Sequence, residues 1–260
     1  MIPSLYISHG SPMTVLTESP ARDFLKSLAS LIDRPQAIVV ASAHWETDTP
    51  RLSAPPRNST IHDFYGFPPA LYELRYNAPG APALASDIAH MLGKAGFSCD
   101  IDHERGLDHG AWVPLLLAYP EANIPVLQLS LQTHQGPRHH LALGAALAPL
   151  REAGVLILGS GSFTHDLRRF RHGLPELDAP ETQDVTAFST WMDEKIQAGD
   201  VPALLDYRRL APFAAEEHPT EEHLLPLYVA LGAAGAKPVA TRLHSSVEFG
   251  FLRMDAYEFS

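Results

Sequence analysis

Short apolar runs and amphipathic stretches alternate along most of this chain. Four short, mostly apolar runs, bounded by polar or turn residues, predict buried β-strands over 2–8, 37–43, 124–131 and 155–160. Strands of this continuous apolar kind are typical of parallel sheets, whose two faces are both covered by helices. The alternation of strands with helical segments therefore favours the α/β class.

The segments between these runs carry apolar residues at helical spacing. Ser19 and Pro20 are typical of a helix start, and the apolar residues from Phe24 to Ile32 fall on one face. Further helices are expected over 82–95, 109–119, 139–152, 184–197 and 221–231. Long loops are expected over 47–80 and 171–180, and a closing hairpin over 239–257. We expect a single catalytic domain over 1–260, with a central, mostly parallel or mixed sheet flanked by helices.

Composition narrows the function classes. The 260 residues carry a formal net charge of −11, which argues against nucleic acid as a partner. The single cysteine, Cys99, excludes an internal disulfide framework and a cysteine-based zinc knuckle. No apolar stretch is long enough for a membrane span, and no basic segment precedes the first strand. A cytoplasmic location without membrane or nucleic-acid partners is expected; protein partners cannot be inferred.

Two histidines directly follow predicted strands. His9 comes after the first apolar run and is followed by Gly10 and Pro12, which permit a tight turn and prevent the strand from continuing. His44 comes after the second run. Ligands of parallel α/β sheets bind outside the carboxyl ends of the strands, and histidine is the commonest transition-metal ligand. This placement predicts a mononuclear metal site at the carboxyl ends of the strands.

A third histidine, His165, follows the fourth apolar run within a glycine-rich turn, Gly159–Asp166 (GSGSFTHD). The turn fits neither the dinucleotide fingerprint, since position 164 is Thr, nor the nucleophile elbow, since no serine has glycines at both required spacings. His165 is expected at the same edge of the sheet, as a metal ligand or as a general base.

His223 has two interpretations that depend on where its helix begins. A helix over 221–231 would be kinked by Pro226, whereas a helix that begins at Pro226 leaves His223 in the preceding loop. The adjacent Glu222 is interpreted as a charge that favours a helix start. His218 is expected at the surface.

His109 is expected at a helix start that Asp108 caps. Its imidazole there suits a hydrogen-bond donor or base near an anionic intermediate, or is simply part of the cap. The aromatic loop 61–76 either covers a cleft for a flat apolar ligand or is pinned to the surface by its rings. For His62, in the same loop, a position in the cleft is an alternative but is not the prediction. The remaining histidines are assigned to surface or structural positions: His90, His103, His134, His139, His140, His172 and His244.

Several stretches together resemble a known family. They are SHGSPM, PQAIVVASAHWET, TIHDFYGFPPALYELRYNAPG, GLDHGAWVPL, PVLQLSL, GSGSFTHDL and TEEHLLPLYVALGA, in order from residue 5 to about 233. In this they are similar to the 4,5-DOPA extradiol dioxygenase-like proteins, a branch of the class III (LigB-type) extradiol ring-cleavage dioxygenases.

The resemblance implies an α/β fold with one divalent metal ion per chain, Fe(II) for oxygenase activity or Zn(II) as isolated. By the same resemblance His9, His44 and His223 are metal ligands, His165 is an acid/base or a further ligand, and His109 lines the substrate and oxygen pocket. The implied reaction opens the ring of a small aromatic diol, DOPA-like, with O2 to give a semialdehyde. LigB-type enzymes use two histidines and a glutamate, whereas the third position here is His223. A zinc-dependent hydrolase and a non-enzymatic binding protein of the same superfamily are the alternatives.

Overall fold

The continuous apolar runs become the central strands of one mixed sheet, where helices cover both of their faces. The computed structural model describes residues 1–260, apart from the side chain of His172. The eight strands are ordered β4-β3-β5-β2-β6-β1-β10-β7. The four in the middle are all parallel: β5 (Val126–Leu131), β2 (Ala37–Glu46), β6 (Val155–Gly161) and β1 (Ser4–Ser8).

Antiparallel strands extend the sheet on both sides. β10 (Ala256–Phe259) pairs with β1, and β7 (Ala240–His244) pairs with β10. On the other side β3 (Arg51–Ser53) pairs with β5, and β4 (Asp100–Asp102) lies parallel to β3. The expected hairpin over 239–257 is wrong in detail. Its first strand, β7, pairs with β10, which begins only at Ala256 and runs past the predicted segment. In the sequence between them, β8 (Val247–Glu248) and β9 (Leu252–Arg253) form a separate two-stranded sheet.

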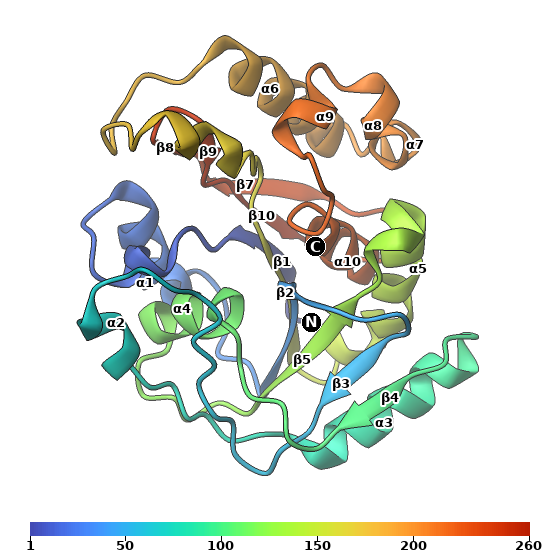
Figure 1. The fold of residues 1–260 in the computed structure, drawn as a ribbon. Coiled ribbons are helices and arrows are strands. Elements are labelled where there is room, and N and C mark those ends of the chain that lie inside the picture. Colours follow the sequence, from blue (N-terminus) through green and yellow to red (C-terminus); the bar gives the residue numbers. More distant parts are fainter.

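Helices cover both faces of the sheet (Figure 1). One face packs against α1 (Pro20–Leu31) and α4 (His109–Ala118), and the other against α3 (Pro82–Lys94), α5 (Gly136–Leu147) and α10 (Leu225–Ala233). Successive residues of a strand point into the two hydrophobic cores in turn. In β1, Leu5 and Ile7 are buried in the core under α1 and α4, and Tyr6 is buried in the core under α5 and α10. The expected α/β class and single-domain architecture are confirmed.

Shorter elements fill the connections. Ser19 and Asp108 cap α1 and α4, as expected, by accepting hydrogen bonds from backbone amides in the first turn. The loop 47–80 contains β3 and a short helix that the sequence pattern did not predict. The remaining helices are α2 (Pro69–Glu73), α6 (Gln183–Gln197), α7 (Val201–Leu205), α8 (Tyr207–Leu210) and α9 (Ala214–Glu217). The 3-10 helices are η1 (Pro12–Val15), η2 (Thr133–Gln135), η3 (Ala148–Arg151) and η4 (Leu167–His172). None of the helices described is both long and apolar enough to cross a bilayer.

Candidate metal centre

Two parallel strands that flank β6 deliver His9 and His44 to the same end of the sheet. His9 directly follows β1, as expected, and is 2 % exposed. His44 lies inside β2, not after it, because the strand continues through a register shift to Glu46. Since β1, β6 and β2 are neighbours and parallel, both imidazoles face the region beyond the carboxyl end of β6.

The segment before α10 carries the third imidazole. The helix begins at Leu225, so His223 lies in the preceding turn. Glycine in β6 lets this turn lie directly on the strand: a Cβ added to Gly161 would meet the carbonyl oxygen of His223 at 2.0 Å. That carbonyl also accepts a hydrogen bond of 2.9 Å from the backbone amide of Ser162. The strand therefore fixes the backbone of His223 beside the other two histidines.

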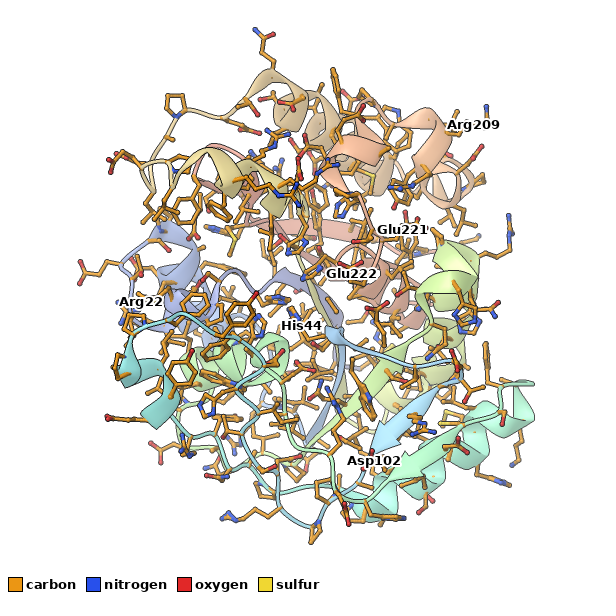
Figure 2. The ribbon with its side chains drawn as sticks, in the orientation of Figure 1. Arg22, His44, Asp102, Arg209, Glu221 and Glu222 are labelled. Carbon is orange, nitrogen blue, oxygen red and sulfur yellow. The ribbon has the colours of Figure 1, made fainter. Side chains whose placement is uncertain are left out.

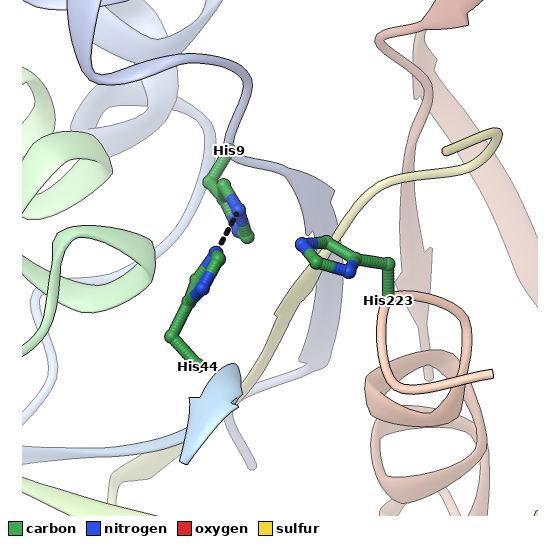
Figure 3. Close-up of side chains that lie close together, drawn as sticks. All are labelled: His9, His44 and His223. Atoms are coloured by element: carbon green, nitrogen blue, oxygen red, sulfur yellow. Dashed lines mark hydrogen bonds between the residues drawn. The ribbon is translucent and has the colours of Figure 1, made fainter. Parts of the chain in front are cut away.

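The three rings converge on one point (Figure 3). His9 Nε2 and His44 Nε2 are 3.1 Å apart, and one nitrogen from each of His9, His44 and His223 lies within 4.8 Å of the others. Two imidazole nitrogens bound to one ion at about 2.1 Å are about 3.0 Å apart at a right angle and about 3.4 Å apart in a tetrahedron. The spacing of His9 and His44 fits this range.

Hydrogen bonds on the far side of the rings orient two of the lone pairs. Ser160 Oγ donates its proton to the carbonyl of Gly110, so it accepts the 3.0 Å bond from His9 Nδ1. Glu222 likewise accepts a 3.0 Å bond from His223 Nδ1. Both rings then present an unprotonated Nε2 toward the common point. His223 Nε2 is buried there without a hydrogen-bond partner among the described residues, and a metal ion would be such a partner.

The surroundings keep these imidazoles neutral. Burial, followed by the charges of neighbouring imidazoles, lowers the pKa of His9 and of His223 well below the usual value. Burial and then His109 lower the pKa of His44 as well, although Asp63 opposes this shift. Metal ligation requires the neutral ring, so the residues present fit a single divalent ion.

His165 and His109 each lie against one of these three histidines. His165 stacks on His223, with ring centroids 3.3 Å apart and planes inclined by 14°. Burial lowers its pKa to about 4, and its ring nitrogens make no hydrogen bond within the part of the chain that the structure describes. His109, at the start of α4, lies against His44 with centroids 3.9 Å apart. All five histidines assigned a role from the sequence therefore lie together.

Two carboxylates in the centre received no such role from the sequence. Asp63 accepts hydrogen bonds of 2.9 Å from both the backbone amide and the ring Nδ1 of His109, and lies 3.7 Å from His44 Nδ1. Burial opposes ionisation of Asp63, but these bonds from His109 hold its pKa below the usual value. Glu222 was interpreted as a charge that favours a helix start, but its carboxylate instead accepts a hydrogen bond from His223. Glu222 and His44 are both labelled in Figure 2. One indication of these roles is present in the sequence, where Asp63 follows His62 and Glu222 precedes His223.

The other histidines lie elsewhere. His218 was expected at the surface, and this is wrong: it is fully buried because α9 folds back onto the core, where its Nε2 bonds to the carbonyl of Phe163. His140 is also fully buried, in a structural role, between the amide of Gln132 and the carbonyl of Gly136. The expectation for His172 lies outside the described side chains.

A pocket of about 520 Å³ opens onto the histidines. Its walls come from the turn after β1, the aromatic loop, η4 and the β8–β9 turn, and they are mainly apolar. The apolar side chains of these walls include Met13, Phe64, Phe67, Phe170, Phe249 and Leu252. The aromatic loop thus covers a cleft, the first of its two interpretations.

Comparison with known proteins agrees with the fold and the site. The family model of the catalytic LigB subunit of aromatic ring-opening dioxygenase matches residues 3–251. The chain belongs to this family. The resemblance inferred from the sequence motifs is confirmed, and family and site together support a single bound metal ion.

Particular relatives match over almost their whole length. The chain is 45 % identical to a 4,5-DOPA dioxygenase extradiol of Beta vulgaris, covering 99 % of this chain and 96 % of that protein. It is 37 % identical to the Escherichia coli K12 protein of the same name, covering 97 % and 93 %. A crystal structure of an uncharacterised Escherichia coli K12 protein superposes with a TM-score of 0.81 at 30 % identity, covering both chains fully.

Proposed function

We propose that this protein is an extradiol dioxygenase that opens the ring of a catechol with O2 to give a semialdehyde. The observation that carries the proposal is the convergence of His9, His44 and His223 around an unpartnered, buried Nε2 beside an apolar pocket. Relatives of 37–45 % identity bear the name 4,5-DOPA dioxygenase extradiol. The catalytic unit spans the whole chain, and a cytoplasmic location stays a prediction.

His9, His44 and His223 would hold the ion, Fe(II) in the active enzyme and Zn(II) when zinc replaces it. A bound ferrous ion supplies a site where a catechol and O2 exchange electrons, which neither the histidines nor the apolar walls can do. Three histidine ligands also suit zinc. The identity of the bound metal would therefore determine whether the protein is an oxygenase or is inactive or hydrolytic.

His165 is placed to take a proton from the catechol. Its ring is neutral, makes no hydrogen bond with the described side chains or backbone, and is part of the pocket wall. Its stacking on His223 holds the ring beside the ion site without using either nitrogen. Removing one hydroxyl proton makes the diol a more electron-rich substrate for oxygen, which is the contribution expected of a general base.

His109 lies against His44 and is positioned by Asp63. Because Asp63 accepts from Nδ1, the neutral ring of His109 presents Nε2 as a hydrogen-bond acceptor; after taking up a proton it presents Nε2–H to an oxygen-derived anion. One Asp63 oxygen is held by the backbone amide of His109, so the other oxygen, which accepts from ring Nδ1, keeps the ring in this orientation. The apolar walls exclude bulk water from the reacting groups.

Oxygen uptake tests the proposal. The protein is stripped of metal, loaded anaerobically with Fe(II), and mixed with a catechol and O2. We expect one O2 consumed per catechol and a new absorbance from the ring-opened semialdehyde. The zinc-loaded protein is the matched control and should consume none. Ester or amide hydrolysis by the zinc form, without oxygen uptake by the iron form, would instead establish the hydrolase.

A further inference from the structure

The backbone of His44 lies where the pairing of β2 becomes irregular. The register of β2 with β6 runs up to Ser42, and its register with β5 shifts between Ala41 and Glu46. Buried backbone groups that a sheet ladder does not pair are held by side chains or by water. Two side chains hold His44: Ser42 Oγ accepts a 3.2 Å hydrogen bond from its amide, and Arg105 Nη2 donates one of 3.3 Å to its carbonyl.

Both of these side chains also bond to the carboxylate of Asp108. Its Oδ1 accepts a 2.7 Å hydrogen bond from Ser42 Oγ, and its Oδ2 accepts one of 3.1 Å from Arg105 Nη2. One carboxylate oxygen is thus linked through a side chain to the amide of His44, and the other to its carbonyl. Because Asp108 is fully buried, water does not compete for these charge-assisted bonds, which strengthens them.

Gln128 of β5 in turn holds Asp108. Its Nε2 donates to Asp108 Oδ2 at 2.7 Å, and its Oε1 accepts from the backbone amide of Asp108 at 2.9 Å. Gln128 is fully buried in a central strand of mainly apolar residues, where an amide costs free energy unless it is hydrogen-bonded. Since both ends of this amide bond to one residue, we expect Gln128 to fix the carboxylate of Asp108 in its orientation.

By capping α4, Asp108 also fixes the first turn of that helix. Within this turn Gly110 lies against His44, because a Cβ added to it would meet His44 Cδ2 at 3.0 Å. The carbonyl of Gly110 accepts the proton of Ser160 Oγ, which leaves that oxygen to accept from His9. The turn therefore contacts one candidate ligand directly and is connected to a second through one serine.

We propose that Asp108 is a positioning residue of the metal centre: its carboxylate, acting through two neighbouring side chains, holds the backbone of His44 and so fixes the His44 ring beside His9 (Figure 3). This inference rests on the proposed function only in that the histidines hold a divalent ion. A shift of the His44 backbone changes the 3.1 Å spacing between the Nε2 atoms of His44 and His9, and one ion needs that spacing to bind both.

Metal binding tests the proposal independently of the reaction. The metal-free full chain is titrated with Co(II), whose visible absorption bands depend on the number and arrangement of its ligands, and zinc affinity is measured by competition. Ser42→Ala removes the hydroxyl between Asp108 and His44 and leaves the helix cap in place. We expect its zinc affinity to fall about 10- to 100-fold, which is the range for loss of an indirect partner of a metal ligand, and its cobalt bands at saturation to shift.

Ser4→Ala is the matched control. Ser4 is also a fully buried serine of a central strand, and its Oγ donates to the carbonyl of Ala230 at 2.7 Å, but it lies at the amino end of β1, whereas His9 follows the carboxyl end. The control variant loses one buried hydrogen bond, as Ser42→Ala does. We expect it to keep the zinc affinity and the cobalt bands of the wild type.

Two more variants address the carboxylate and its second branch. Arg105→Met removes the donor to the His44 carbonyl and keeps an unbranched side chain against the Trp45 ring. Asp108→Asn replaces one accepting oxygen by an NH₂ group, which cannot accept from Ser42 or from Arg105. Each should weaken zinc binding at least tenfold and shift the cobalt bands. If Asp108→Asn does not fold, Ser42→Ala and Arg105→Met decide.

The positioning role and the proposed function fail separately. Cobalt bands that stay unchanged in Ser42→Ala and Arg105→Met would overturn the positioning role, and so would an equal loss of affinity in Ser4→Ala. A wild-type chain that binds neither cobalt nor zinc would overturn both the positioning role and the metal-dependent function. If the variants behave as expected but the iron-loaded wild type cleaves no catechol, the positioning role is supported and the dioxygenase is rejected.

Discussion

The role of Asp63 gives the sharpest test of the centre. Its two carboxylate oxygens separately accept from the backbone amide and from the ring Nδ1 of His109, each at 2.9 Å. Asparagine has the same shape but only one oxygen. When that oxygen keeps the backbone bond, the NH₂ group faces Nδ1, and the ring proton must move to Nε2. Asp63→Asn therefore presents a donor where the wild type presents an acceptor.

The size of the effect follows from the bond that is lost. A hydrogen bond to a charged group contributes about 1.5–3 kcal/mol. If the bond acts fully in the transition state, kcat falls by about 10- to 150-fold, since about 1.4 kcal/mol corresponds to a factor of ten. The Asp63 side chain is 23 % exposed, and the asparagine keeps the backbone bond, so the fold should lose only about 1 kcal/mol of stability.

The assay follows semialdehyde absorbance at saturating catechol with the iron-loaded protein, and metal content is measured in parallel. Asp63→Glu is the matched control, because it retains two oxygens and should recover part of the rate. Wild-type kcat in Asp63→Asn would refute the positioning role. Loss of metal in that variant would show instead that Asp63 acts through His44, whose Nδ1 lies 3.7 Å away.

Four further predictions concern metal binding, packing and pH. His44→Ala should abolish stoichiometric metal binding, whereas His165→Ala should retain metal and lose ring cleavage, as metal analysis and oxygen uptake would show; metal loss in the second variant would make His165 a ligand. Chelation should lower the melting temperature, since an ion at 100 times its Kd stabilises the fold by about 2.7 kcal/mol; an unchanged temperature contradicts the site. Gly110→Ala should weaken metal binding at least tenfold, because a Cβ there would meet Ser42 Oγ at 2.5 Å and His44 Cδ2 at 3.0 Å, while Gly93→Ala, with open space around it, should leave affinity unchanged. Burial lowers the pKa of His140 to about 4 from 6.5, so the unfolded chain binds the extra proton and stability falls as the pH drops through this window. In His140→Gln the slope of unfolding free energy against pH should be shallower by up to about 1.4 kcal/mol per pH unit; an identical slope would refute this.

The central strands and capped helices could be predicted from the sequence because their signals are local. The apolar runs around residues 5, 40, 128 and 157 became the four parallel strands, and Ser19 and Asp108 cap the helices where expected. Weakly apolar or very short elements were missed. β4, with the sequence Asp-Ile-Asp, exists because it pairs with β3, which is a contact between distant segments.

The identity of the histidines came from sequence, but their meeting did not. Strand ends suggested His9 and His44, and family motifs suggested His223. Nothing local in the sequence shows that His9 and His223, 214 positions apart, lie around one candidate ion site. The sheet order β2-β6-β1 and the glycines of β6 decide that proximity, because they place the three backbones at one edge. Asp63 and Glu222 gained their roles only through this packing.

Composition and periodicity thus determined the class of fold, the helix starts and the residue types able to bind a metal, since each depends on neighbours within a few positions. Tertiary structure decided which nitrogens face inward, that His218 is buried, and that the pocket walls are mainly apolar. Those properties depend on burial and on side chains from separate segments, and they arise only when the whole sheet has assembled with its helices.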